Sequence, residues 1–180
     1  MKHEKGFTLV ELAVIVSIIG FMTVLVFSNY GKNNEIFALE RASQKLTQDL
    51  RRAQEMAMSG SGSIGVTKGF GLYFNEGANE TYLFYEDKDV NMVWEAATDA
   101  LIETITIEKG VKICEVKKIG PNAAEDVISI SFAPPDPLTY IGGNVSGHVG
   151  AIALCTKTDT TIKKYIKVNN VGMVEITSSL

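Results

Sequence analysis

The segment Lys5-Gly6-Phe7-Thr8-Leu9-Val10-Glu11-Leu12 opens a long apolar stretch that decides the class of this protein. Between residues 7 and 30, Glu11 is the only formally charged side chain. A helix of about 20 such residues is long enough to cross the hydrocarbon core of a membrane. Lysines precede this span and none lies within it, so the positive-inside tendency predicts a cytoplasmic N-terminus and places the bulk of the chain on the other side.

Three interpretations of this segment compete. A cleaved secretory signal needs small residues after the apolar run, and Phe27-Ser28-Asn29-Tyr30 is a poor cleavage site. A plain membrane anchor leaves Glu11 unexplained, because a carboxylate inside a span costs about 2.5–3.5 kcal/mol on insertion scales. No basic residue occurs in the twenty positions after Glu11, so we expect the partner of this carboxylate outside its own helix.

The third interpretation comes from a resemblance. The quoted segment resembles the processing site of type IV prepilins and of type II secretion pseudopilins. The resemblance implies that prepilin peptidase cleaves between Gly6 and Phe7 and methylates the new N-terminus at Phe7. It also implies that Glu11 pairs with the Phe7 ammonium of an adjacent subunit during filament assembly. Residues 1–6 would then be a leader peptide, and residues 7–30 a transmembrane and assembly helix.

Residues 31–59 are expected to continue this helix as an amphipathic segment. Apolar residues recur every three or four positions between residues 36 and 57, which places them on one helical face, and most charged residues fall elsewhere. Gly60 is predicted to end the helix. One half of the long helix would therefore lie in lipid, and the other half must bury its apolar face against a folded domain.

Residues 60–180 predict that folded domain. Short runs rich in β-branched and aromatic residues alternate with turn-forming residues, as expected for antiparallel strands. The expected strands are residues 64–66, 70–74, 82–85, 105–107, 111–116, 127–132, 151–155, 162–168 and 173–176. The sequence contains no second long helix. The predicted fold class is therefore α+β, with one or two antiparallel sheets forming a sandwich-like β domain packed on the helix.

Two further stretches narrow the resemblance. Residues 49–59 (DLRRAQEMAMS) and Gly71-Leu72-Tyr73-Phe74 resemble GspH/FimT-type pseudopilins and minor pilins. This resemblance implies a structural subunit of a type IV pilus or type II secretion pseudopilus, in a minor or initiating role. The alternatives are a DNA-binding minor pilin for DNA uptake and an adhesive tip pilin. None of these roles is enzymatic or needs a cofactor.

The resemblance also implies a location and a set of partners. The chain would begin as a single-pass protein of the bacterial inner membrane, with its N-terminus in the cytoplasm, and then join a cell-surface or periplasmic filament. Its partners would be other pilin or pseudopilin subunits, prepilin peptidase, the inner-membrane assembly platform and membrane lipid. DNA would be a partner only in the alternative role.

The composition of the chain does not indicate a catalytic, metal-binding or nucleic-acid-binding function. The chain has 180 residues, a formal charge of −4 and two histidines, and it contains no catalytic or metal-binding motif that we recognise. Four acidic residues crowd positions 87–99, but a glycine-centred calcium loop is missing there, so no metal site is predicted. The net negative charge of the chain does not favour general binding to nucleic acid.

Two smaller features are candidate sites. Cys114 and Cys155 both fall in expected strands, and they are either a disulfide in an oxidising compartment or two unrelated buried thiols. Lys157, Lys163, Tyr165 and Lys167 crowd one stretch of an otherwise acidic chain. Lys163, Tyr165 and Lys167 would share one face of a strand. That face is either a DNA-binding surface or a solvated edge whose lysines discourage aggregation.

Overall fold

The structure is a computed structural model that describes residues 6–59, 69–120, 126–134, 138–144 and 147–179. The chain divides into two compact units, residues 1–35 and 36–180. Helix α1 (Leu9–Met58) contributes to both of them. In the first unit, the side chains of residues 9–26 are all exposed.

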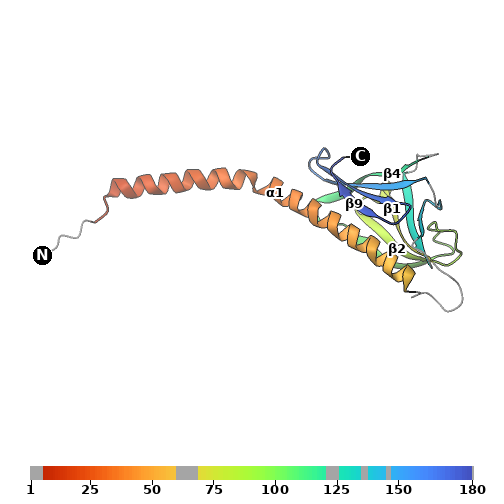
Figure 1. Ribbon diagram of the computed structural model, residues 1–180. Helices are drawn as coiled ribbons and strands as arrows, with labels where there is room; N and C mark the ends of the chain where they lie inside the picture. Colours follow the sequence, from red (N-terminus) through yellow and green to blue (C-terminus); the bar gives the residue numbers. More distant parts are fainter. Residues whose placement is uncertain (1–5, 60–68, 121–125, 135–137, 145–146, 180) are drawn as a thin grey trace. The chain divides into compact units, whose positions relative to one another are not determined.

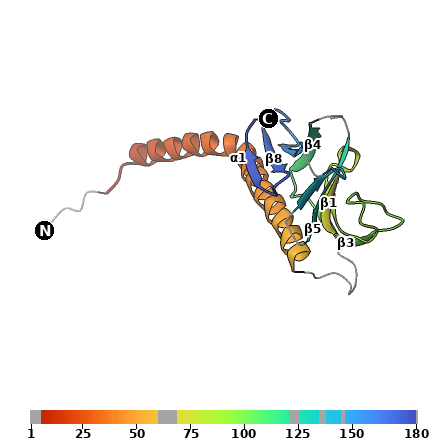
Figure 2. The same cartoon turned by 45° about the vertical axis from the view of Figure 1, so that its right-hand side comes forward.

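The second unit contains two antiparallel sheets (Figures 1 and 2). The first sheet has the order β3-β2-β1-β5-β6, and the second has the order β4-β7-β8-β9. The strands of the first sheet are β1 (Gly69–Asn75), β2 (Thr81–Asp87), β3 (Ala100–Thr106), β5 (Val127–Ala133) and β6 (Leu138–Ile141). Those of the second are β4 (Val111–Ile119), β7 (Val149–Thr156), β8 (Lys163–Asn169) and β9 (Val174–Thr177). A short 3₁₀ helix, η1 (Glu76–Ala78), connects β1 to β2.

The core of the second unit lies between α1 and the inner faces of both sheets. Leu39, Leu46 and Leu50 of α1 are at most 1% exposed, as the spacing of apolar residues predicted. They belong to one cluster with aromatic residues of the first sheet, such as Phe132, and aliphatic residues of the second, such as Ile152. The α+β prediction, with antiparallel sheets packed on the helix, is therefore confirmed.

Polar contacts along the rim of this core fix where the helix docks. Glu40 of α1 forms an ion pair with Lys164 of β8, at 2.9 Å. The Tyr82 hydroxyl of β2 donates a hydrogen bond to Asp49, at 2.6 Å. The Gln54 amide donates to the carbonyl of Gly172, in the turn between β8 and β9, at 2.6 Å. Both sheets are thus tied to the same stretch of helix.

Several strand predictions need correction. The strand expected at residues 64–66 and the helix stop at Gly60 lie outside the described residues. Strand β6 was not predicted, and β3 begins five residues before the expected strand. Strand β4 continues past residue 116 to Ile119, because Lys117 and Lys118 remain paired with β7. Lysine is less common in strands than β-branched and aromatic residues, so the pattern of the sequence ended this strand too early.

Candidate processing and assembly site

The residues before α1 are open to solvent. Gly6 and Thr8 are exposed, and the side chain of Phe7 is 79% exposed. A Cβ atom built on Gly6 meets nothing within 4 Å, and Gly6 is not in the positive-φ region that favours glycine. Nothing in the local fold therefore requires glycine at position 6, and a larger side chain would fit there.

Thr8 and Glu11 form a capping box at the first turn of α1. The Glu11 amide donates to Thr8 Oγ1 at 3.3 Å, while the Thr8 amide and hydroxyl donate to Glu11 Oε2 at 3.1 Å and 3.0 Å. A helix leaves its first amides without internal acceptors, and this reciprocal arrangement satisfies two of them. Glu11 therefore has neutral hydrogen-bond partners at Thr8, just before α1. The charged partner expected outside its own helix stays a prediction.

The apolar span follows directly. Residues 9–26 form a helical stretch of 18 residues with a mean hydropathy of 2.6, none of it buried within the protein. Its two hydroxyl side chains do not interrupt it, since Ser17 donates to the carbonyl of Ala13 and Thr23 to that of Ile19. By length and composition this helix is able to cross a membrane.

The two cysteines lie side by side in the second sheet. Cys114 of β4 and Cys155 of β7 form a disulfide, with Cα atoms 5.9 Å apart. Cys155 is fully buried, and Cys114 lies at a shift in strand register between Ile113 and Glu115. The segment between the two cysteines includes β5 and β6 of the other sheet. The bond therefore constrains strands from both sheets.

The predicted basic cluster is only partly brought together. Lys163, Tyr165 and Lys167 alternate along β8 with the buried residues Ile166 and Val168, so they share the outer face of the second sheet. Lys157 lies just after β7, where its Nζ is 2.5 Å from Glu80 Oε1.

Glu115 of β4 partly neutralises this outer face. It accepts a hydrogen bond from the Tyr165 hydroxyl at 3.3 Å, and it forms ion pairs with Lys117 and, at 3.9 Å, with Lys163. The hydrogen bond from Lys117, together with the charges of both lysines, lowers the pKa of Glu115. Sequence reasoning missed this acidic residue because it is almost fifty positions away in the chain.

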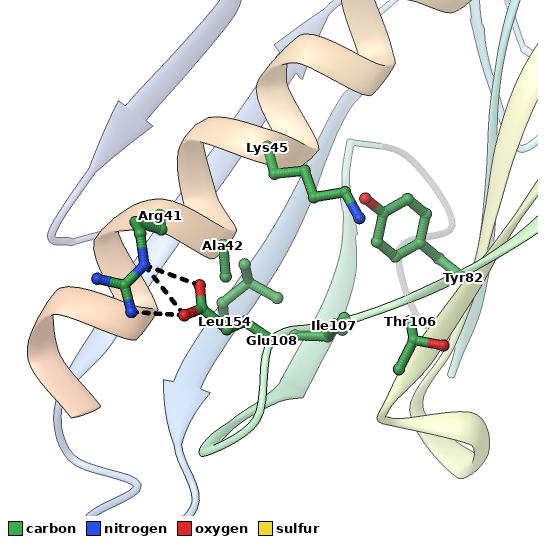
Figure 3. Close-up of a pocket in the computed structure, with 8 residues that line it drawn as sticks. All are labelled: Arg41, Ala42, Lys45, Tyr82, Thr106, Ile107, Glu108 and Leu154. Atoms are coloured by element: carbon green, nitrogen blue, oxygen red, sulfur yellow. Dashed lines mark hydrogen bonds and ion pairs between the residues drawn. The ribbon is translucent and has the colours of Figure 1, made fainter. Parts of the chain in front are cut away.

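A cavity of about 350 Å³ opens between α1 and the start of β2 (Figure 3). Its apolar lining comes from Ala42, Ile107 and Leu154. Arg41 and Lys45 of α1 add positive charge. Arg41 is held by Glu108 through three hydrogen bonds, from Nε to both carboxylate oxygens and from Nη2 to Oε1. In Figure 3 the Lys45 nitrogen points toward the Tyr82 hydroxyl. No sequence pattern indicated this cavity, because its lining comes from segments far apart in the chain.

The acidic residues after β2 also converge. Carboxylate oxygens of Asp87, Asp89 and Asp99 lie within 4.8 Å of one another. Asp87 is fully buried, and its two oxygens accept hydrogen bonds from the amides of Val90, at 2.7 Å, and Met92, at 2.6 Å. Burial raises the pKa of Asp87, whereas these two amide bonds lower it less. The cluster therefore organises the turn that joins β2 to β3.

Comparison with known proteins bears on the N-terminal segment alone. Residues 1–27 match the family model of the prokaryotic N-terminal methylation motif. No curated protein and no solved structure matches the chain. The motif supports a type IV pilin-like or pseudopilin-like substrate of prepilin peptidase, which is a structural class of protein. Together with the apolar helix, it indicates that the chain is anchored in the inner membrane.

Proposed function

We propose that this chain is a minor or initiating subunit of a type IV pilus or a type II secretion pseudopilus, processed between Gly6 and Phe7 and assembled through its N-terminal helix. The observation that carries the proposal is the methylation motif over residues 1–27. The open space around Gly6 agrees with it, because the fold of this chain does not need a glycine there, whereas a peptidase that admits only a small side chain would.

Assembly would depend on the charge that processing creates. Cleavage after Gly6 releases the α-amine of Phe7, which is protonated at neutral pH. The capping box holds the Glu11 carboxylate at the first turn of α1, next to this new terminus in sequence. An ammonium of a neighbouring subunit would offer Glu11 a hydrogen bond in which both groups are charged, which adds a Coulomb attraction that the neutral Thr8 donors do not supply. Cleavage of the leader and the axial alignment of neighbouring helices would therefore both depend on the Glu11 carboxylate.

The disulfide supports the proposed topology. Disulfides persist in oxidising compartments and are rare in the cytoplasm. A bond between Cys114 and Cys155 is consistent with a β domain that lies across the inner membrane from its N-terminus. The peptidase and the assembly platform would meet the chain at the membrane, and other subunits would meet it in the filament.

The test is mass spectrometry of the chain recovered from sheared filaments. The account predicts a chain that begins at N-methylated Phe7. Recovery of an intact Met1 terminus from filaments would contradict it. Gly6→Ala should be processed better than Gly6→Val, because the peptidase is expected to admit only a small side chain. Both variants should accumulate equally in the membrane, since within the described residues a Cβ at this position meets nothing within 4 Å beyond its chain neighbours.

A DNA-binding minor pilin is a second candidate, favoured by the shared outer face of Lys163, Tyr165 and Lys167. Lys117 lies across Ala151 from Lys167 and would extend that face. If the face binds the phosphate backbone, Lys163→Glu with Lys167→Glu should abolish salt-dependent DNA binding by the full chain in detergent. Lys88→Glu with Lys109→Glu makes the same charge change at exposed positions elsewhere and should leave binding unchanged. Equal DNA binding by both double variants would contradict this role and favour the alternative, in which these lysines form a solvated edge of the sheet.

A further inference from the structure

The cavity beside α1 combines an apolar lining with positive charge. Arg41 and Lys45 contribute two cations and Glu108 contributes one carboxylate, so one positive charge is in excess. The Arg41–Glu108 pair is already formed, and within the described part of the chain Lys45 has no ion pair or hydrogen bond. An apolar pocket with a few convergent polar groups is typical of a binding site. This one suits an apolar group that carries negative charge beside it.

The turn between β2 and β3 presents that chemistry. Val90 lies within this turn, 46% exposed, with a φ of 65°. A β-branched residue rarely adopts positive φ, and burial does not explain it here. The carboxylates of Asp89 and Asp99 converge with that of Asp87 in the same turn, so an exposed apolar side chain and negative charge occur together there. The amide bonds to Asp87 hold the turn in this shape before any partner arrives, which lowers the entropy lost on binding.

The cavity and the turn lie at opposite ends of the same pair of strands. Tyr82, near the start of β2, lines the cavity, and the turn begins immediately after Asp87 at the end of β2. Five residues of extended strand separate these positions by roughly 17 Å. One copy therefore cannot place its own turn in its own cavity. Copies arranged head to tail would satisfy both features, and a contact of this heterologous kind can be repeated along a filament.

We propose that the β2–β3 turn of one copy docks into the cavity beside α1 of the next, with Val90 against Ile107 and Leu154 and with Asp89 facing Lys45. This inference rests on the proposed function, because it assigns a contact between neighbouring subunits of the filament. Charge complementarity selects this occupant. The exposed turn between β8 and β9 presents Val171, which is 69% exposed, but the flanking side chains Asn169, Asn170 and Met173 carry no charge.

The experiment is site-specific cross-linking in cells that produce two full-length, differently tagged copies. One copy carries Val90→Cys and the other carries Lys45→Cys, and a short thiol-reactive cross-linker is added. The expected product is a dimer that contains both tags, with neither variant giving a dimer when it is produced alone. Val171→Cys paired with Lys45→Cys is the matched control, since it places a thiol on an equally exposed valine of another turn. Lys88→Cys, two residues before Val90, provides a second position on the docking turn.

Each outcome decides the inference. A mixed dimer from the Val90 or Lys88 variant and none from the Val171 variant supports it. Failure of both turn variants, or an equal yield from the Val171 variant, overturns it. The N-terminus of the same chains is measured by mass spectrometry in parallel. An intact Met1 would count against the proposed function, whereas chains that begin at Phe7 and give no mixed dimer would overturn this contact alone.

Discussion

Thr8 and Glu11 satisfy amides that the first turn of α1 leaves open, and this local chemistry constrains the proposed assembly step. The carboxylate has hydrogen bonds within its own chain before any other subunit approaches. Both Thr8 donors bind Oε2, and a carboxylate has about four acceptor positions, so a neighbouring ammonium would find a carboxylate that is already held in place but still able to accept a further hydrogen bond. Because an ammonium is charged and the Thr8 donors are neutral, we expect the ammonium to be the stronger partner.

Replacing Thr8 tests the cap. Thr8→Val keeps the shape of the side chain but removes the hydroxyl, and the loss of a cap costs about 1 kcal/mol. Hydrogen exchange of the Glu11 amide, measured by NMR on the full chain in micelles, should then become about fivefold faster. Thr8→Ser retains the hydroxyl and should exchange like the wild type. Unchanged exchange in Thr8→Val would mean that the capping box does not form in the membrane-embedded chain.

At the scale of elements, the sequence predicted most of the parts but not their arrangement. The spacing of Leu39, Leu46 and Leu50 identified the buried face of the helix, because a helix places such residues on one side. Strand β6 escaped prediction because it has four residues and buries Thr139 while Leu138 is 43% exposed, the reverse of the usual pattern. The division into two sheets depends on pairing between distant strands, which a local pattern does not encode.

The candidate sites, like the strands, could be predicted only where their residues are close together in the chain. The motif around Gly6 and Glu11 was readable because its residues are adjacent in the chain. Glu115 beside the basic face and Lys45 beside Tyr82 were not, because folding brings them together from distant segments. For the acidic residues after β2, the sequence shows only that they are close together along the chain, and not that their carboxylates converge in space. Its shape depends on amide hydrogen bonds to Asp87, which composition does not reveal.

The contact between α1 and β8 has a pH dependence that follows from Glu40. A hydrogen bond from Lys164 lowers the pKa of Glu40. A carboxylate with a lowered folded pKa stabilises the fold above its ordinary pKa of about 4.3, and this stabilisation is lost as the pH falls through the lowered value. Glu40→Gln should therefore reduce the free energy of unfolding at pH 7, by less than about 1 kcal/mol because the pair is exposed.

The measurement is urea unfolding of the full chain in micelles, followed by circular dichroism. The difference between Glu40→Gln and wild type should shrink when the pH is lowered from 7 to 3. Glu55→Gln is the matched control, because Glu55 is exposed on the same helix and its side chain makes no hydrogen bond or ion pair within the described residues. A difference that stays constant with pH would show that Glu40 acts through packing rather than charge.

At the scale of the whole molecule, one covalent bond constrains a large part of the second unit. The Cys114–Cys155 bond spans a sequence separation of 41 residues and encloses two strands of the other sheet. By the chain-entropy model, closing a loop of this length stabilises a fold by roughly 4 kcal/mol. The bond directly joins β4 to β7 within the second sheet and keeps β5 and β6 of the first sheet inside a closed loop.

Removing both cysteines tests this constraint. The double variant Cys114→Ser, Cys155→Ser should lower the free energy of unfolding by about 2–4 kcal/mol. Adding a reductant should destabilise the wild type by a similar amount and leave the double variant unchanged. Thiol labelling of the unfolded chain, purified without reductant from cells, should find no free cysteine. Complete labelling of both cysteines would contradict an oxidised, extracytoplasmic domain.

The central claim is that Glu11 couples processing to assembly, and one comparison tests it most directly. Filaments are sheared from cells that produce wild-type or Glu11→Ala chains, and their subunit content is compared with the membrane pool by immunoblot. Glu11→Ala should insert and be cleaved normally, because removing a charge makes the helix easier to insert. Its incorporation into filaments should fall sharply, with Glu11→Asp intermediate, since that carboxylate is one methylene shorter. Normal incorporation of cleaved Glu11→Ala chains would contradict the account.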